Sequence, residues 1–251
     1  MLTALKEETY KFCHEQIALL GLLVLLVTTL YSTLTKTINK STLIFAFGAI
    51  EWIPVIIIAV GAAFFEMEYD NKTIVMLLYK NSSKLKIYLA KFLVVFCYSI
   101  ALALGAILLT FLLSLLTVPG QYHWLAYYQG HTILTDLLLN LFGAVIYCFF
   151  IVGLSFMLIM LVKANTVVIC IGLVLAYFGA SFSTALMHTF PTAVGILKWN
   201  PLNMIFISQQ LTRGSFALKS NLTNFQLIIA TVVYGIIFGL LGYYLFKRRR
   251  V

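Results

Sequence analysis

Long apolar runs alternate with short polar segments along this chain of 251 residues. Six runs are long enough to cross a hydrocarbon core about 30 Å thick, which takes roughly 20 residues of helix. They lie at residues 17–34, 43–65, 92–117, 133–162, 166–187 and 225–246. The pattern predicts an all-α polytopic membrane protein in which residues 1–251 form a single domain of six transmembrane helices.

Two of the polar segments are expected to carry further short helices. Residues 1–16 mix charges of both signs with Leu2, Leu5 and Phe12, which favours an amphipathic helix at the membrane surface. Residues 188–223 contain two short apolar pieces that each open on a proline, and Asn200 before Pro201 suits a helix cap. We expect this segment to form re-entrant or interfacial helices on the outer side, before the last span.

The composition fits a membrane protein and no other broad class. Hydrophobic residues make up 62% of the chain and charged residues 10%, and the mean hydropathy is +1.02. Soluble domains have about 45–50% apolar and about 25% charged residues. A soluble enzyme, a small secreted protein and a nucleic-acid-binding protein are therefore excluded.

The basic residues predict the orientation of the six spans. Both termini share one side, which holds twelve of the 17 lysines and arginines. Because cytoplasmic loops are enriched in lysine and arginine, we expect the protein to lie in the cell membrane with both termini on the cytoplasmic side. The net charge of +9 is explained by contact with anionic lipid headgroups.

The chain shows no catalytic or metal-binding motif. The four cysteines have no CxxC spacing and the four histidines have no ligand spacing. Phosphate-binding loops, HExxH and GxSxG motifs are also missing. We therefore assign no catalytic residue, and we expect the chain not to use ATP on its own.

Residues 66–91, between the second and third spans, are unusual for a cytoplasmic connection. An apolar stretch at 74–79 is flanked by charged residues on both sides. Six apolar residues are too few to span a membrane, yet they are costly to leave in water. Two interpretations remain open from the residues alone: a short helix that inserts into a groove of another protein, or a helix folded against the membrane surface.

This segment resembles the coupling loop of permeases from the type-2 exporter family of ABC transporters. Glu68 and Thr73 match an acidic and a threonine position of the family. The coupling helix is matched by Ile74, Val75, Met76, Leu77 and Leu78 and followed by Tyr79; the turn after it is matched by Ser82, Ser83 and Lys84, and the closing lysine by Lys91. Lys72 and Asn81 depart from the usual glycine and proline.

The resemblance implies an ATP-driven exporter of which this chain is the membrane subunit. Two copies of a separate ATPase subunit would bind ATP and Mg²⁺, and a second permease copy, or a close paralogue, would complete the pathway. The cargo would be hydrophobic or amphipathic: a drug, a lipid, or an antimicrobial or toxin peptide. Glu68, Thr73 and the apolar residues 74–79 would couple the permease to the ATPase.

Glu51, beside Trp52 and Pro54, is an acidic residue deep inside a predicted span. Counted from residue 65, it lies about two-thirds of the way across the membrane. An ionisable residue at that depth is a functional candidate, and these three residues are assigned to the substrate pathway. Two alternatives stay open: a span that begins later and leaves Glu51 at the outer interface, and a proton-coupled carrier or channel in which Glu51 titrates.

Overall fold

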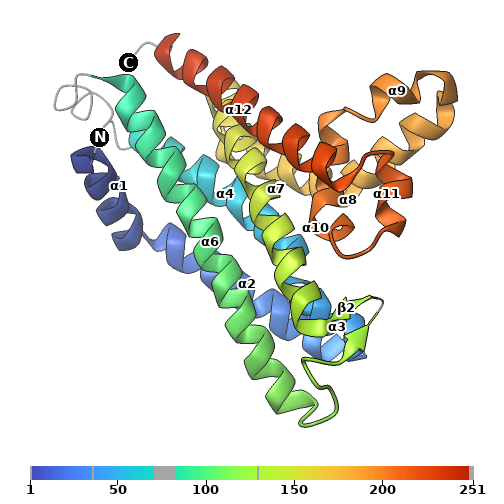
Figure 1. Ribbon diagram of the computed structural model, residues 1–251. Helices are drawn as coiled ribbons and strands as arrows, with labels where there is room; N and C mark the ends of the chain where they lie inside the picture. Colours follow the sequence, from blue (N-terminus) through green and yellow to red (C-terminus); the bar gives the residue numbers. More distant parts are fainter. Residues whose placement is uncertain (1, 36, 71–82, 129, 249–251) are drawn as a thin grey trace.

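The computed structural model describes residues 2–35, 37–70, 83–128 and 130–248 (Figure 1). Within these ranges, six helices are long and apolar enough to cross a membrane. They are α2 (Gln16–Thr35), α4 (Ala49–Asp70), α6 (Lys84–Thr117), α7 (Ile133–Val162), α8 (Asn165–Thr189) and α12 (Asn224–Arg248). The prediction of an all-α polytopic fold with six spans is confirmed.

The second and third spans have different bounds from those predicted. The second begins at Ala49 rather than at residue 43 and continues to Asp70, and the third begins at Lys84 rather than at residue 92. Helix therefore occupies both ends of the predicted loop 66–91. Charged residues end an apolar run in the sequence, but they do not end a helix that extends beyond the membrane.

A left-handed turn separates α2 from α4. The short helix α3 (Lys40–Ile44) and the 3-10 helix η1 (Ala46–Gly48) precede α4, and Ala46, Phe47 and Gly48 have φ values of 49°, 51° and 87°. Such values are unusual for non-glycine residues. Phe47 is fully buried in a small apolar cluster with Leu43 and Ile44. Because the turn is built from apolar residues, the hydrophobic pattern merged it with the second span.

Helix α7 is the central helix, with α4, α6, α8 and α12 packed against it. Its closest neighbour is α12, and two glycines allow the approach. A Cβ atom on Gly153 would lie 2.6 Å from the carbonyl oxygen of Gly235. The small residues of α12 thus serve packing within the chain, as small residues do between membrane helices.

The N-terminal helix α1 (Leu2–His14) packs against α6. Phe12 is buried and makes edge contacts with Phe64 and Tyr98, at ring-centroid distances of 5.1 and 5.0 Å. Leu2 is exposed, whereas Glu8 is buried on the packed face. Of the predicted apolar face, Phe12 contacts the bundle and Leu2 does not, and the Glu8 carboxylate lies on the packed face with Phe12.

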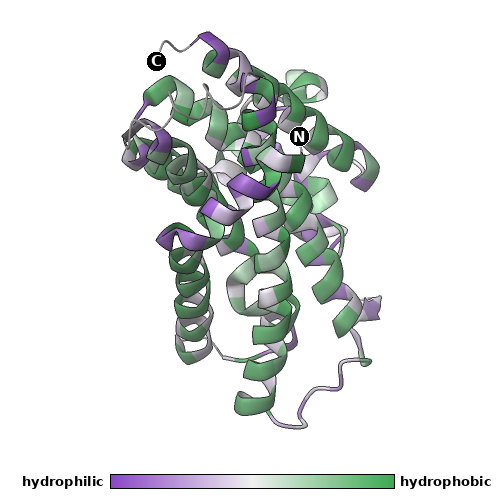
Figure 2. Cartoon of the chain, turned by 90° about the vertical axis from the view of Figure 1, so that its left-hand side faces the viewer, coloured by the Kyte–Doolittle hydropathy of each residue, from purple (hydrophilic) through white to green (hydrophobic). Residues whose placement is uncertain are grey.

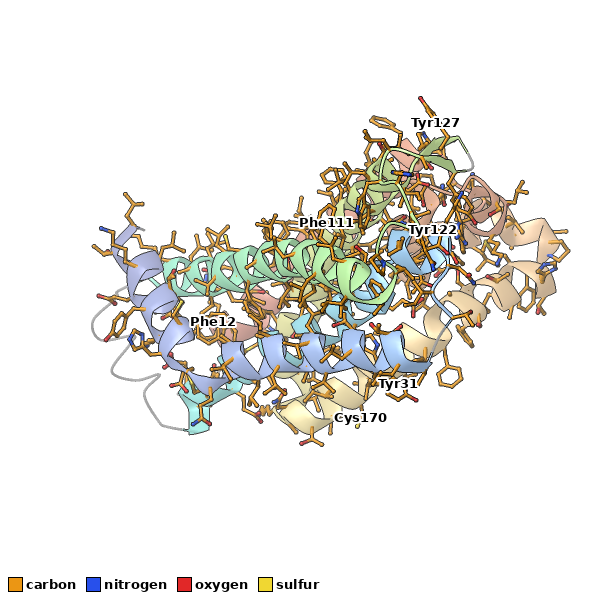
Figure 3. All side chains as sticks on the ribbon, turned by 90° about the horizontal axis from the view of Figure 1, so that it is seen from below. Phe12, Tyr31, Phe111, Tyr122, Tyr127 and Cys170 are labelled. Atoms are coloured by element: carbon orange, nitrogen blue, oxygen red, sulfur yellow. The ribbon has the colours of Figure 1, made fainter. Side chains whose placement is uncertain are left out.

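The bundle has two distinct ends. Helix α1 and the C-terminal part of α12 lie at the same end of the bundle, which we call the terminal end (Figure 1). The opposite end, the far end, carries the hairpin of β1 (Tyr127–Tyr128) and β2 (His131–Thr132), which the sequence did not predict. Figure 3 shows Phe12 at the terminal end and Tyr122 and Tyr127 at the far end. The long helices are mainly hydrophobic along their length (Figure 2).

The segment between α8 and α12 folds into short helices at the far end. They are η2 (Pro191–Ala193), α9 (Val194–Leu197), η3 (Pro201–Phe206), α10 (Ile207–Gln210) and α11 (Ser215–Ser220). The predicted cap is confirmed, because the Asn200 side chain accepts a hydrogen bond from the backbone N–H of Asn203 at 3.0 Å. The buried Asn203 amide donates to the carbonyls of Lys198 and Ser220, both at 2.7 Å, and so fixes α11 against η3.

Candidate functional site

A cavity of about 650 Å³ lies between the far ends of α4 and α8. Tyr147 of α7 contributes to its wall, and η3, α10 and α11 complete it. Glu51, Trp52 and Pro54, the residues assigned to a substrate pathway, all line this cavity. The volume is in the range of small-molecule binding sites.

Glu51 lies in the first turn of α4, at the far end of the span. Its position along the helix therefore differs from the sequence estimate, which placed the start of the span at residue 43. The side chain is exposed, and among the described residues it has neither a hydrogen bond nor an ion pair. A carboxylate in a first helical turn is favoured by the helix dipole.

Trp52 and Pro54 shape the α4 wall of the cavity. The indole ring of Trp52 meets Tyr177 of α8 edge-on, with ring centroids 6.4 Å apart. Proline has no backbone N–H, so Pro54 cannot donate the usual helical hydrogen bond to the carbonyl of Ile50, another lining residue. Two aromatic side chains thus line the cavity together with Glu51.

A cluster of four charged residues lies at the terminal end, where α1, α4 and α6 meet. Lys91 Nζ lies 2.8 Å from Glu8 Oε2 and 3.1 Å from Glu68 Oε1. Lys11 Nζ lies 3.0 Å from the same Glu68 oxygen and 3.7 Å from Glu8 Oε1. We call these four residues the charge cluster. Two carboxylates and two ammonium groups balance one another in it.

The charge cluster is buried except for Lys11. Lys91 is 0% exposed and Glu68 1%. Lys91 also donates to the Phe64 carbonyl at 3.3 Å, and its Nζ lies 3.8 Å from the centre of the Phe64 ring. Buried charges are tolerated only when they are paired and hydrogen-bonded, and removing one partner is strongly destabilising. The cluster therefore fixes α1 and α6 to the last turns of α4.

A second carboxylate near the end of α4 binds the start of α8. Glu66 Oε1 accepts a hydrogen bond from the backbone N–H of Asn165 at 3.0 Å. The residue at the N-cap of α8 is Ala164, whose side chain cannot cap. Glu66 provides the missing acceptor and places negative charge at the positive end of the α8 dipole. Helices α4 and α8 are thus joined at the terminal end and bracket the cavity at the far end.

A family model described as ABC-2 family transporter protein matches residues 4–179 of the chain. The chain belongs to the ABC-2 transporter family. The matched region runs from α1 through part of α8 and includes the whole charge cluster, Glu66 and the α4 wall of the cavity. The comparison with curated proteins gave no match. As an ABC-2 permease, the chain is a membrane transport component, and its family implies association with an ABC ATPase.

The structure places only part of the coupling assignment in this ABC-2 permease. Thr73 and residues 74–79 lie outside the described residues. Glu68 is described, and it is a buried member of the charge cluster. Sequence reasoning missed Glu8, Lys11 and Glu66, because only the fold brings α1 and α8 to the end of α4. The mixed charges of residues 1–16 were the one signal for the first two.

No metal centre is indicated in the part of the chain that the structure describes. That part contains no group of three or more histidine, cysteine, aspartate or glutamate residues close enough to hold an ion. The acidic and basic residues of the cavity come from three separate elements: Glu51 from α4, His188 from α8 and Lys219 from α11. The last two are far from Glu51 in sequence, and nothing in their local sequence marks them as its neighbours.

Proposed function

We propose that this ABC-2 permease is the membrane subunit of an ATP-driven exporter for hydrophobic or amphipathic cargo. Two copies of a separate ATPase subunit bind at residues 74–79 and supply ATP hydrolysis with Mg²⁺, and two permease copies form the pathway. The terminal end is cytoplasmic, as its lysines and arginines favour, and the cavity is on the outer side of a cell membrane.

One observation carries this proposal: α4 and α8, which form walls of the cavity, are bound to each other next to residues 71–82, which we call the coupling segment. Glu66 and Glu68 stand just before residues 71–82 and bind α8, α1 and α6. Glu51 and Glu66 are separated by about 22 Å along one continuous helix. A displacement of the coupling segment by the ATPase is thereby transmitted along α4 and α8 to the cavity walls.

Transport requires that nucleotide and cargo favour different arrangements of these helices. The helices have two arrangements. ATP binding draws the two ATPase subunits together and favours one of these arrangements, and cargo in the cavity favours the two arrangements to different extents. A proton-coupled carrier instead needs its titrating carboxylate within the barrier to ions. Glu51 is exposed in the first turn of α4, a position that favours contact with cargo over a proton relay.

The coupling assignment is tested by placing charge on the apolar stretch. The triple substitution Ile74→Asp, Met76→Asp and Leu77→Asp is expected to abolish co-purification of the ATPase and its stimulation by the permease, because an apolar anchor cannot be replaced by carboxylates. Leu2→Asp is the control, since Leu2 is 76% exposed on α1. Unchanged assembly and ATP turnover in the triple variant would show that coupling runs elsewhere.

A further inference from the structure

The cavity contains charges of both signs that are not paired with each other. Glu51 and Lys219 both line it, and within the described residues no ion pair joins Lys219 to any carboxylate. Lys219 Nζ lies over the ring of Phe216, 5.0 Å from its centre. His188 adds a second basic group on α8. The charge cluster at the terminal end is the opposite case, because its four charges neutralise one another.

Uncommitted hydrogen-bonding groups accompany these charges. The side chains of Ser181 and Gln209 line the cavity and, in the described part of the chain, have no hydrogen-bond partner. The hydroxyls of Thr184 and Ser208 are already used, by the carbonyls of Ala180 at 2.8 Å and Ile205 at 3.0 Å. The free polar groups therefore form a limited set, suited to a small polar headgroup.

Apolar surface continues from the cavity toward the middle of the bundle. Tyr147 lines the cavity and also a second hollow of about 120 Å³. Phe150, Leu154, Leu175 and Phe238 line this second hollow, so its surroundings are almost wholly apolar. A ligand with a charged head and a hydrocarbon tail fits this sequence of polar and apolar walls.

We propose that the cavity binds a zwitterionic phospholipid or a lipid-like amphiphile of the same headgroup chemistry. The amine of the headgroup lies against Glu51, the phosphate against Lys219 and His188, and the acyl chain along the apolar surface next to Tyr147. A purely cationic ligand leaves Lys219 without a counter-charge, and a purely anionic one leaves Glu51 without one. As a statement about cargo, the inference rests on the proposed function; as a statement about binding, it does not.

Binding is measured on the purified full-length permease in detergent, without the ATPase, by native mass spectrometry. Three probes share dihexanoyl chains and differ in headgroup: phosphatidylethanolamine, phosphatidylglycerol, and a trimethylammonium-propane lipid. We expect the zwitterionic probe to bind about tenfold more tightly than either singly charged probe, since the loss of one charge-assisted contact that costs about 1.4 kcal/mol is tenfold in Kd.

Two substitutions separate the contacts. Glu51→Gln is expected to lower the affinity for the zwitterionic probe about tenfold and to leave the affinity for the anionic probe unchanged. Lys219→Gln is expected to lower the affinity for the zwitterionic and the anionic probe and to leave the affinity for the cationic probe unchanged. Lys219→Arg is expected to restore binding. Lys198→Gln is the matched control, because Lys198 also stacks on an aromatic ring, 5.8 Å from the centre of Trp199, but does not line the cavity. Melting curves confirm that each variant is folded.

The inference is overturned if the anionic and zwitterionic probes bind equally, or if Glu51→Gln and Lys219→Gln act no differently from Lys198→Gln. It is equally overturned if Lys219→Arg, correctly folded, fails to restore binding. Because no ATPase is present, a negative result leaves ATP-driven export intact. Failure of ATP-driven export, with binding as expected, would contradict the proposed function and leave the lipid site standing.

Discussion

Single residues at the terminal end show how far sequence comparison reaches. The resemblance to type-2 exporters singled out Glu68 and Lys91 by motif position, and the structure joins them by a 3.1 Å ion pair. Neither the motif nor the charge pattern indicated that Glu8 would take the other side of Lys91, 2.8 Å away. That contact depends on how α1 packs against α6, which short-range pattern does not determine.

Lys91→Met is expected to lower the free energy of unfolding by roughly 3–5 kcal/mol, because the carboxylates of Glu8 and Glu68 lose the buried ammonium group that pairs with both of them. The melting temperature of the purified protein in detergent measures this loss. Lys86→Met, an exposed position one turn closer to the start of the same helix, is the control and should melt like the wild type. Equal melting of both variants would show that the charge cluster contributes no stability.

At the scale of elements, the length of the apolar runs predicted all six spans but not which helices pack against each other. The run at 43–65 concealed the turn at Phe47, because buried turns and buried helices are equally apolar. The hairpin at Tyr127–Thr132 is too short to give an alternating pattern. The Gly235 and Gly239 pair was visible in the sequence, but a GxxxG pattern does not distinguish packing within a chain from packing between copies.

Gly153→Ala is expected to destabilise the contact between α7 and α12, because the new Cβ would lie 2.6 Å from the Gly235 carbonyl oxygen and the helices must separate. Gly105→Ala in α6 is the matched control, since a Cβ there has open space around it. Alanine is the better helix former, so the control should melt at the same or a higher temperature. A Gly153 variant as stable as the Gly105 variant would contradict the close packing.

At the scale of the whole molecule, α4 and α8 connect the cavity at the far end with the charged residues at the terminal end, two regions that the sequence pattern does not link. Residues 66–91 and Glu51 are both unusual in the sequence, yet only the structure shows that α4 carries Glu51 together with the first part of that segment, residues 66–70, and that Glu66 ties this helix to α8. We propose that motion of residues 71–82 reaches the cavity along these two helices. Such motion changes the distance between α4 and α8, which spectroscopy measures directly.

The most direct test is the distance between spin labels at Val55 on α4 and Ala185 on α8, two residues that line the cavity. The labels are introduced after the four native cysteines are replaced, and the permease is reconstituted with its ATPase. We expect ATP with Mg²⁺ to shift the distance distribution, and Glu66→Ala to reduce the shift while ATP hydrolysis persists. A distribution that is identical with and without ATP, in a complex that hydrolyses ATP, would show that the motion of the ATPase does not reach the cavity walls.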